Sequence, residues 1–242
     1  MRDILIKGTN ELSLALDEVQ LDKLEKYAQL LKEWNEKINL TAITDDEGIA
    51  TKHFIDSMTA LCTDKVEGKV IDVGTGSGFP GLVLKIAKPE IGLTLLDSLN
   101  KRISFLQEVS SQLELEGIEF VHSRAEDGGQ NAALRGSFDT VVSRAVANLR
   151  VLCEWCLPFL KVGGYFLALK GPLAEQELSD AKKAIKILGG EVEEVFEAKI
   201  PMTDLSHKII VIKKVRQTPM KYPRKPGIAT KIPIEQCYKL RK

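Results

Sequence analysis

Apolar positions along the chain change their spacing near residue 69. Before that point the spacing is helical between residues 12 and 38, where Leu24, Ala28 and Leu31 recur at intervals of four and three. A further short helix is expected over residues 49–61. We therefore predict a helical N-terminal cap over residues 1–63, lying across the front of the part that follows.

From residue 69 onward, short apolar runs alternate with helical spacings. The runs predict strands at 69–73, 92–97, 118–122, 138–143 and 164–169, and the spacings predict helices near 80–88, 100–116, 126–134, 147–160 and 173–188. Such alternation is typical of a parallel sheet with helices on both faces. Two last strands, 191–196 and 207–213, are only ten residues apart, too few for a crossover, so we predict an antiparallel hairpin.

These elements together predict the fold class. Five parallel strands with a terminal hairpin make an α/β, Rossmann-like sheet over residues 64–214. This is the architecture of class I S-adenosylmethionine-dependent methyltransferases.

Residues 215–242 differ from the rest in charge and in proline content. From Lys213 to the end there are ten Lys or Arg and the single acid Glu235, a local charge of +9 in a chain of zero net charge. Four of the nine prolines lie here, and proline fixes φ and removes a hydrogen-bond donor. We predict a basic C-terminal tail on one compact domain, with an extended backbone over residues 222–227, binding RNA phosphates through Arg224 and Lys225 among others.

A glycine-rich turn, DVGTGSGFPG at residues 72–81, follows the first expected strand. Such a turn lets a ligand lie against bare backbone. Gly76, Gly78 and Gly81 fit a dinucleotide fingerprint, which alone is a weak signal. We expect Asp72 at the mouth of the turn, where a carboxylate would repel the pyrophosphate of NAD and attract the ammonium and sulfonium of S-adenosylmethionine.

Polar residues follow the next strands. Asp97, after the second strand, is expected to accept both ribose hydroxyls, which suits NAD and S-adenosylmethionine equally. Ala125 and Glu126, after the third, would flank the adenine, although Glu126 fits a helix cap as well. All of these strand ends meet at the edge of the sheet where ligands of open α/β sheets bind.

Arg144 and Lys170 end the fourth and fifth strands and are candidate catalytic residues. Either cation could clamp a phosphate or a carbonyl oxygen of the substrate, while Arg144 could instead pair with Asp139 or Glu126. The catalytic residues are otherwise unknown from sequence. His53, next to apolar residues, fits a packed histidine better than a catalytic one.

The absence of two motifs limits the kinds of atom that could accept the methyl group. Residues 143–147 do not match the Asn/Asp-Pro-Pro-aromatic motif of enzymes that methylate exocyclic amines, and no Pro-Cys pair supplies a nucleophile for pyrimidine C5 methylation. This leaves a target with a free lone pair, such as a purine ring nitrogen. Transfer to such an atom needs alignment more than a base.

Other partners and compartments are not supported. There is no apolar stretch of 18 residues and no long apolar core near the start, so we expect a cytoplasmic protein without a membrane partner. Cys153 and Cys156 form a C-x-x-C in an apolar helical pattern without a second pair. We expect core packing there and no metal.

Several motifs together resemble one family. They are NLTAI at 39–43, HFIDS at 53–57, the turn at 72–81, LDS at 96–98, RAE at 124–126, SRAVA at 143–147, ALKG at 168–171 and YPRKPG at 222–227. This set is similar to that of the bacterial ribosomal RNA small-subunit methyltransferase G family, also called glucose-inhibited division protein B. The resemblance implies S-adenosylmethionine as donor, N7 of a guanosine in 16S ribosomal RNA or the small ribosomal subunit particle as target, and donor contacts at Gly74, Phe79, Ala125, Glu126 and Arg144.

Three other functions fit the sequence less well. An NAD-dependent oxidoreductase would explain the glycines but neither Asp72 nor the tail. A non-catalytic RNA-binding ribosome assembly factor would not need the glycine-rich turn together with the two acids Asp72 and Asp97. A small-molecule or protein methyltransferase would leave the basic tail without a role.

Overall fold

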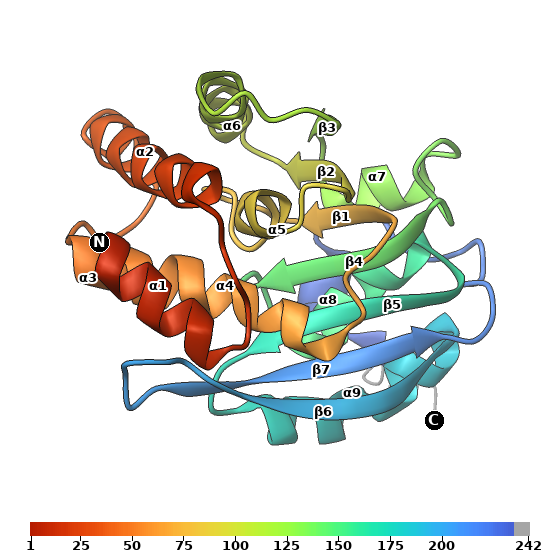
Figure 1. Cartoon of the computed structure of the whole chain (residues 1–242). Helices are drawn as coiled ribbons and strands as arrows, with labels where there is room; N and C mark the ends of the chain where they lie inside the picture. Colours follow the sequence, from red (N-terminus) through yellow and green to blue (C-terminus); the bar gives the residue numbers. More distant parts are fainter. Residues whose placement is uncertain (235–242) are drawn as a thin grey trace.

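A computed structural model describes residues 1–234 of the chain (Figure 1). Its centre is a seven-stranded sheet in the order β3-β2-β1-β4-β5-β7-β6. The strands are β1 (Lys69–Val73), β2 (Gly92–Asp97), β3 (Ile118–His122), β4 (Phe138–Arg144), β5 (Leu160–Lys170), β6 (Gly190–Lys199) and β7 (Ser206–Lys214). The first five are parallel, whereas β7 runs antiparallel to β5 and to β6. The predicted α/β sheet with a terminal hairpin is confirmed.

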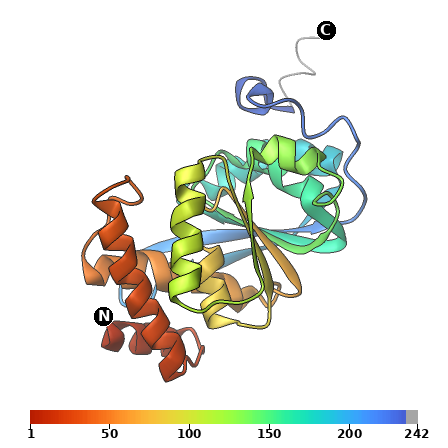
Figure 2. The same cartoon turned by 90° about the horizontal axis from the view of Figure 1, so that it is seen from above.

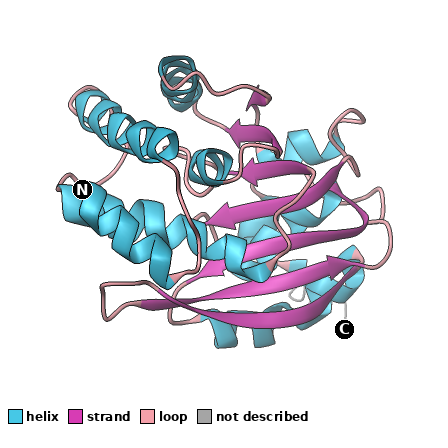
Figure 3. Cartoon of the chain, viewed as in Figure 1, coloured by secondary structure: helices cyan, strands magenta, loops and turns pink. Residues whose placement is uncertain are grey.

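Helices cover both faces of the sheet, as Figures 1 and 3 show. On one face, α5 (Gly81–Ala87), α6 (Asn100–Gln112) and the N-terminal helices share one buried apolar cluster with the sheet. On the other face, α8 (Leu149–Cys156), the 3₁₀ turn η3 (Leu157–Phe159) and α9 (Ala174–Leu188) form a second cluster, with α7 (Ala125–Gln130) beside them. The alternation of helices and strands in the sequence therefore becomes three layers.

The N-terminal cap contains one helix more than predicted. Helix α1 (Arg2–Glu11) precedes α2 (Glu18–Asn35), where the apolar spacing had predicted a single helical stretch from residue 12. Asp17 fixes the start of α2, since its side chain accepts from the Gln20 backbone N–H and the Gln20 side chain accepts from Asp17 in return. The helical stretch is therefore interrupted between α1 and α2, and α2 begins at this capping box.

The expected helix over residues 49–61 is part of a longer helical segment. It comprises α3 (Asp46–Gly48), the π-helix η1 (Ile49–Ile55), α4 (Asp56–Met58) and the 3₁₀ turn η2 (Thr59–Thr63). The Asp45 side chain caps it by accepting from the Gly48 N–H at 2.7 Å. The segment places His53 and Asp56 beside the end of β4.

The described part of the tail packs on the body, a contact that the sequence left open. Arg135 donates to the carbonyl oxygens of Thr218 and Tyr222, both at 2.8 Å, and Tyr222 and Ile234 are buried in the second cluster. A short helix, α10 (Ile228–Lys231), follows (Figure 2). The basic residues beyond 234 lie outside the described part of the chain. Proline content predicted the lack of a strand here but not the docking.

Cys153 and Cys156 pack in the second cluster, as predicted. Both are fully buried and unbridged, and burial raises the pKa of the Cys153 thiol. Within residues 1–234, no helix combines the length and the apolar character needed to cross a bilayer.

Candidate functional site

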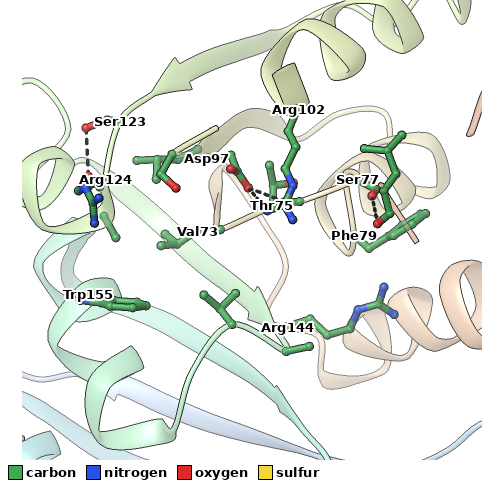
Figure 4. A pocket seen from close by; sticks show the side chains of 18 of the residues that line it. Val73, Thr75, Ser77, Phe79, Asp97, Arg102, Ser123, Arg124, Arg144 and Trp155 are labelled. Carbon is green, nitrogen blue, oxygen red and sulfur yellow. Dashed lines mark hydrogen bonds and ion pairs between the residues drawn. The ribbon is translucent and has the colours of Figure 1, made fainter. Parts of the chain in front are cut away.

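A cavity of about 540 Å³ opens at the carboxyl ends of β1, β2 and β4. Its volume falls in the range of small-molecule sites. The six residues predicted to contact a donor all line it: Gly74, Phe79, Asp97, Ala125, Glu126 and Arg144. In Figure 4, Trp155 and Arg124 lie at one end of this donor cavity, Phe79 and Arg144 lie at the other, and Asp97 lies between them.

The loop between β1 and α5 forms the floor of the donor cavity. Gly74 has a φ of +74°, and a Cβ there would lie 2.8 Å from the Val146 side chain. Gly78 has a φ of +91°, and a Cβ there would lie 2.9 Å from Leu106 and Leu82. A side chain at either position would meet both backbone strain and a collision, so this tight loop requires glycine.

Asp72 supports the loop from beneath, and the prediction that it lies at the cavity mouth is wrong. The residue is fully buried and is not among the cavity lining. Its Oδ2 accepts from the Thr75 hydroxyl at 2.7 Å and from the Gly81 N–H at 2.8 Å, while its Oδ1 is buried without a hydrogen-bond partner among the described residues. Burial raises the pKa of Asp72 to about 6, although these two hydrogen bonds lower it. Asp72 therefore holds the fold of the loop and does not face the ligand.

The raised pKa predicts a pH-dependent effect of Asp72→Asn. A carboxyl group whose pKa is higher in the folded than in the unfolded protein makes the folded state lose stability as the pH rises between the two values. For Asp72 this pH window runs from about 4 to about 6, and the free energy of unfolding lost across it is at most roughly 3 kcal/mol. We expect the free energy of unfolding of Asp72→Asn, relative to wild type, to rise across this window in urea titrations. A difference that stays constant from pH 4 to pH 7 would contradict it.

Asp97 lies at the end of β2 and faces the donor cavity. Its Oδ2 accepts from the Gly76 N–H at 2.9 Å, and its Oδ1 accepts from the Leu99 N–H at 2.9 Å. Arg102 pairs with Oδ2 at 3.3 Å. Because a carboxylate offers about four acceptor positions, Asp97 retains capacity for a hydroxyl donor from a ligand. The residue thus also joins the end of β2 to the glycine loop.

One end of the donor cavity is formed by the start of α7 and by Trp155 on α8. Glu126 does not cap its own helix, since its Oε1 instead accepts from the Gly227 N–H of the tail at 3.1 Å. Arg124 occupies the N-cap position of α7. Sequence reasoning left a capping role for Glu126 open and missed its contact with the tail.

The other end of the donor cavity is formed by Phe79, His53 and Arg144. The rings of His53 and Phe79 stack with centroids 4.5 Å apart, and the Arg144 guanidinium lies 5.3 Å from the Phe79 ring centroid. Arg144 pairs with Asp56, not with Asp139 or Glu126 as the sequence analysis had allowed. Burial and, to a smaller extent, the charge of Arg144 lower the pKa of His53 to about 4, so this imidazole is neutral near pH 7.

A second cavity of about 330 Å³ adjoins the donor cavity, and Arg144 and Ala145 line both. Lys170 lies in this second cavity and not in the first. Its ammonium is 2.8 Å from Glu177 and donates to the Ala147 carbonyl at 2.8 Å. The two cationic candidates therefore come together around the second cavity.

Asp56 and His207 also line the second cavity, and sequence reasoning assigned neither of them a role. His207 Nδ1 lies 2.7 Å from Asp56 Oδ1. Burial opposes ionisation of Asp56, but the hydrogen bond with His207 and the charge of Arg144 hold its pKa below the ordinary value. Asp56 could have been found from its position three residues after His53 on one helix, whereas His207 is on β7 and gave no sequence signal.

Comparison with known proteins decides the family. Residues 20–206 match the family model described as rRNA small subunit methyltransferase G. The chain belongs to this family. A ribosomal RNA small subunit methyltransferase G from Alkaliphilus oremlandii is 54% identical over 97% of this chain and 99% of its own length. One from Clostridium tetani is 50% identical over 96% of this chain and 98% of its own length.

Solved structures with low sequence identity share the fold of this family member. TYW2 of M. jannaschii, solved in complex with AdoMet, has a TM-score of 0.53 at 14% identity, over 72% of this chain and 80% of that one. A putative O-methyltransferase from Klebsiella pneumoniae has a TM-score of 0.57 at 12% identity, over 89% of this chain and 96% of that one. The sheet is that of class I S-adenosylmethionine-dependent methyltransferases.

Proposed function

We propose that this protein transfers a methyl group from S-adenosylmethionine to N7 of a guanosine in 16S ribosomal RNA. Membership of the rRNA small subunit methyltransferase G family supports the RNA substrate. The observation that carries the proposal is the pair of adjoining cavities at the carboxyl ends of the strands, with Arg144 between them. One cavity suits a nucleoside donor and the other suits an acceptor base.

The donor cavity fits S-adenosylmethionine in its chemistry. The glycine loop offers bare backbone, Asp97 offers carboxylate oxygens for ribose hydroxyls, and Ala125 with Glu126 offers acceptors for an adenine edge. When bound, S-adenosylmethionine supplies a methyl group on a sulfonium, which leaves as a neutral thioether. Phe79, beside Arg144, would exclude water from that end of the cavity.

The second cavity supplies cations for the acceptor. We propose that Lys170 or Arg144 contacts guanine O6 or a phosphate, because a cation that also contacted N7 would block the nucleophilic lone pair. Lys170 lies against Glu177, which fixes the position of its ammonium. These residues would orient the base so that N7 lines up with the methyl carbon.

The two predicted RNA contacts on the tail differ in their surroundings. The Arg224 guanidinium is bound to Glu154 and holds the tail to the body. Lys225 is exposed, and we propose it as an RNA contact.

Methyl transfer by this site is expected to be nearly independent of pH. Guanine N7 carries no proton at neutral pH, and His53, the histidine that lines the donor cavity, is already neutral because its pKa is about 4. We expect single-turnover rates on saturating RNA to stay nearly flat between about pH 6.5 and 8.5, whereas a histidine base would produce a rising limb. His53→Ala would then lower the rate without changing the shape of the profile. A rate that climbs tenfold per pH unit would refute the base-free mechanism.

The proposed function is tested by incubating the protein with labelled S-adenosylmethionine and either unmethylated 16S RNA or unmethylated small-subunit particles. Mass mapping of the product should find one N7-methylguanosine. A product methylated on an exocyclic amine, or none with either substrate, would overturn the proposal. Fluorescence titration with NADH is a control for the oxidoreductase alternative. This control is needed because the buried Asp72 does not face the cavity and so could not repel the pyrophosphate of NAD.

A further inference from the structure

The donor cavity has one wall that comes from the tail and not from the strand ends. Gly227 and Thr230 line the same cavity as Ala125, Glu126 and Trp155. The match to the family model ends at residue 206, so this wall lies outside the matched part of the chain. The predicted adenine contacts therefore face a segment that follows the matched residues.

The tail is anchored beside this wall by an ion pair between Arg224 and the buried Glu154. Arg224 Nη2 lies 2.6 Å from Glu154 Oε2, and both Arg224 Nε and its backbone N–H donate to Oε1, at 2.9 Å and 2.8 Å. Glu154 is only 1% exposed and precedes Trp155 on α8. A guanidinium fork on a buried carboxylate fixes direction as well as distance. This contact sets where residues 225–230 lie relative to the cavity.

The tail also orients the carboxylate that is predicted to bind adenine, which belongs to Glu126 on α7. The Gly227 N–H donates to Glu126 Oε1 at 3.1 Å, and Gly227 has a φ of +81°. Glu126 itself is buried, so its carboxylate has little freedom beyond this hydrogen bond. The remaining acceptor positions of a carboxylate suit the exocyclic amino group of adenine, which is a hydrogen-bond donor.

We propose that residues 222–230 form the adenine wall of the donor site. Gly227 orients the Glu126 carboxylate, and Arg224 is a positioning residue that holds the wall against α8. The proposal rests on the proposed function, since it takes S-adenosylmethionine as the donor. The tail is then a part of donor recognition, independent of any contact that it makes with RNA.

The first test measures binding of S-adenosylhomocysteine to the full chain by calorimetry, without RNA. Arg224→Ala is expected to weaken binding at least tenfold, and Arg224→Lys, which keeps the charge but loses the fork, should fall between it and wild type. Arg216→Ala is the matched control, because Arg216 is an exposed tail arginine that donates to the Lys186 carbonyl and does not line the cavity. It should bind like wild type.

A second pair of variants covers the case in which Arg224→Ala does not fold. Thr230 is exposed and lines the cavity, so Thr230→Trp should obstruct the donor and weaken binding at least tenfold while the melting temperature stays unchanged. Its neighbour Lys231 is exposed and does not line the cavity, and Lys231→Trp should bind like wild type.

Base selectivity distinguishes a role of this wall in adenine recognition from a general role in stabilising the fold. In S-inosylhomocysteine a carbonyl replaces the adenine amino group, so Glu126 loses its donor. Wild type should prefer S-adenosylhomocysteine, and Arg224→Lys should reduce that preference at least threefold.

Two results would overturn the adenine wall while wild type still binds the ligand. They are wild-type affinity in Thr230→Trp, or an equal loss for both ligands in Arg224→Lys. Failure of wild type itself to bind S-adenosylhomocysteine would instead refute the donor assignment in the proposed function.

Discussion

Asp97→Ala is expected to lower the affinity for S-adenosylmethionine by about ten- to a hundredfold while the protein stays folded. The carboxylate at the end of β2 would accept from a ribose hydroxyl, and loss of a charge-assisted hydrogen bond costs roughly 1.5–3 kcal/mol. The same side chain accepts from the Gly76 N–H, so its removal also loosens the glycine loop. Calorimetric titration with the donor measures the effect directly.

Asp127→Ala is the control for this prediction. Asp127 is an exposed carboxylate on α7 that does not line the cavity, so its removal should leave donor affinity within about twofold of wild type. Asp97→Asn keeps one acceptor oxygen and should lie between Asp97→Ala and wild type. Unchanged donor affinity in Asp97→Ala would show that the ribose binds elsewhere.

Arg144→Ala should reduce the single-turnover rate on saturating RNA and donor by about a hundredfold or more. Arg144 lines both cavities, lies over Phe79 and pairs with Asp56, so its loss would displace donor and acceptor relative to each other. A misplacement of about 1 Å is enough for a hundredfold effect. Removing Arg144 also leaves the largely buried Asp56 with His207 as its remaining partner, so the loss of stability should stay below the roughly 3–5 kcal/mol of a fully broken buried pair.

The rate measurement therefore needs a folding control and a charge control. Circular dichroism and melting curves identify the temperature at which Arg144→Ala is folded, and rates are compared there. Lys161→Ala removes a cation that pairs with Asp139 at the opposite end of the strands, and it should keep the wild-type rate. A wild-type rate in folded Arg144→Ala would remove this residue from the transfer step.

The sheet could be predicted from sequence because its signal is local. The expected strands at 69–73, 92–97 and 118–122 coincide with β1, β2 and β3, since each is a short apolar run bounded by polar or glycine residues. The order of the strand ends then brings the predicted donor residues together without further information. Helix boundaries at the N-terminus were less accurate, because the break between α1 and α2 depends on the side-chain cap at Asp17.

Contacts between distant residues could not be predicted in this way. Arg224 and Glu154 are 70 positions apart, and the sequence of the tail shows its charge but not the buried carboxylate that it meets. Asp72 is similar, because strand alternation does not tell whether the last carboxylate of a strand turns toward the ligand or back toward Gly81. In both cases the partner is chosen by the tertiary fold.

The side chain shared by the two cavities has a thermodynamic consequence. Because Arg144 lies on the boundary between them, a ligand that changes its position in one cavity changes the affinity of the other. Linkage requires the effect to be reciprocal, so the factor by which the methyl donor alters RNA affinity equals the factor by which RNA alters donor affinity. The product thioether lacks the sulfonium charge of the donor. Replacing the donor by this product would therefore change the coupling factor. Release of the methylated RNA would then depend on which form of the cofactor is bound.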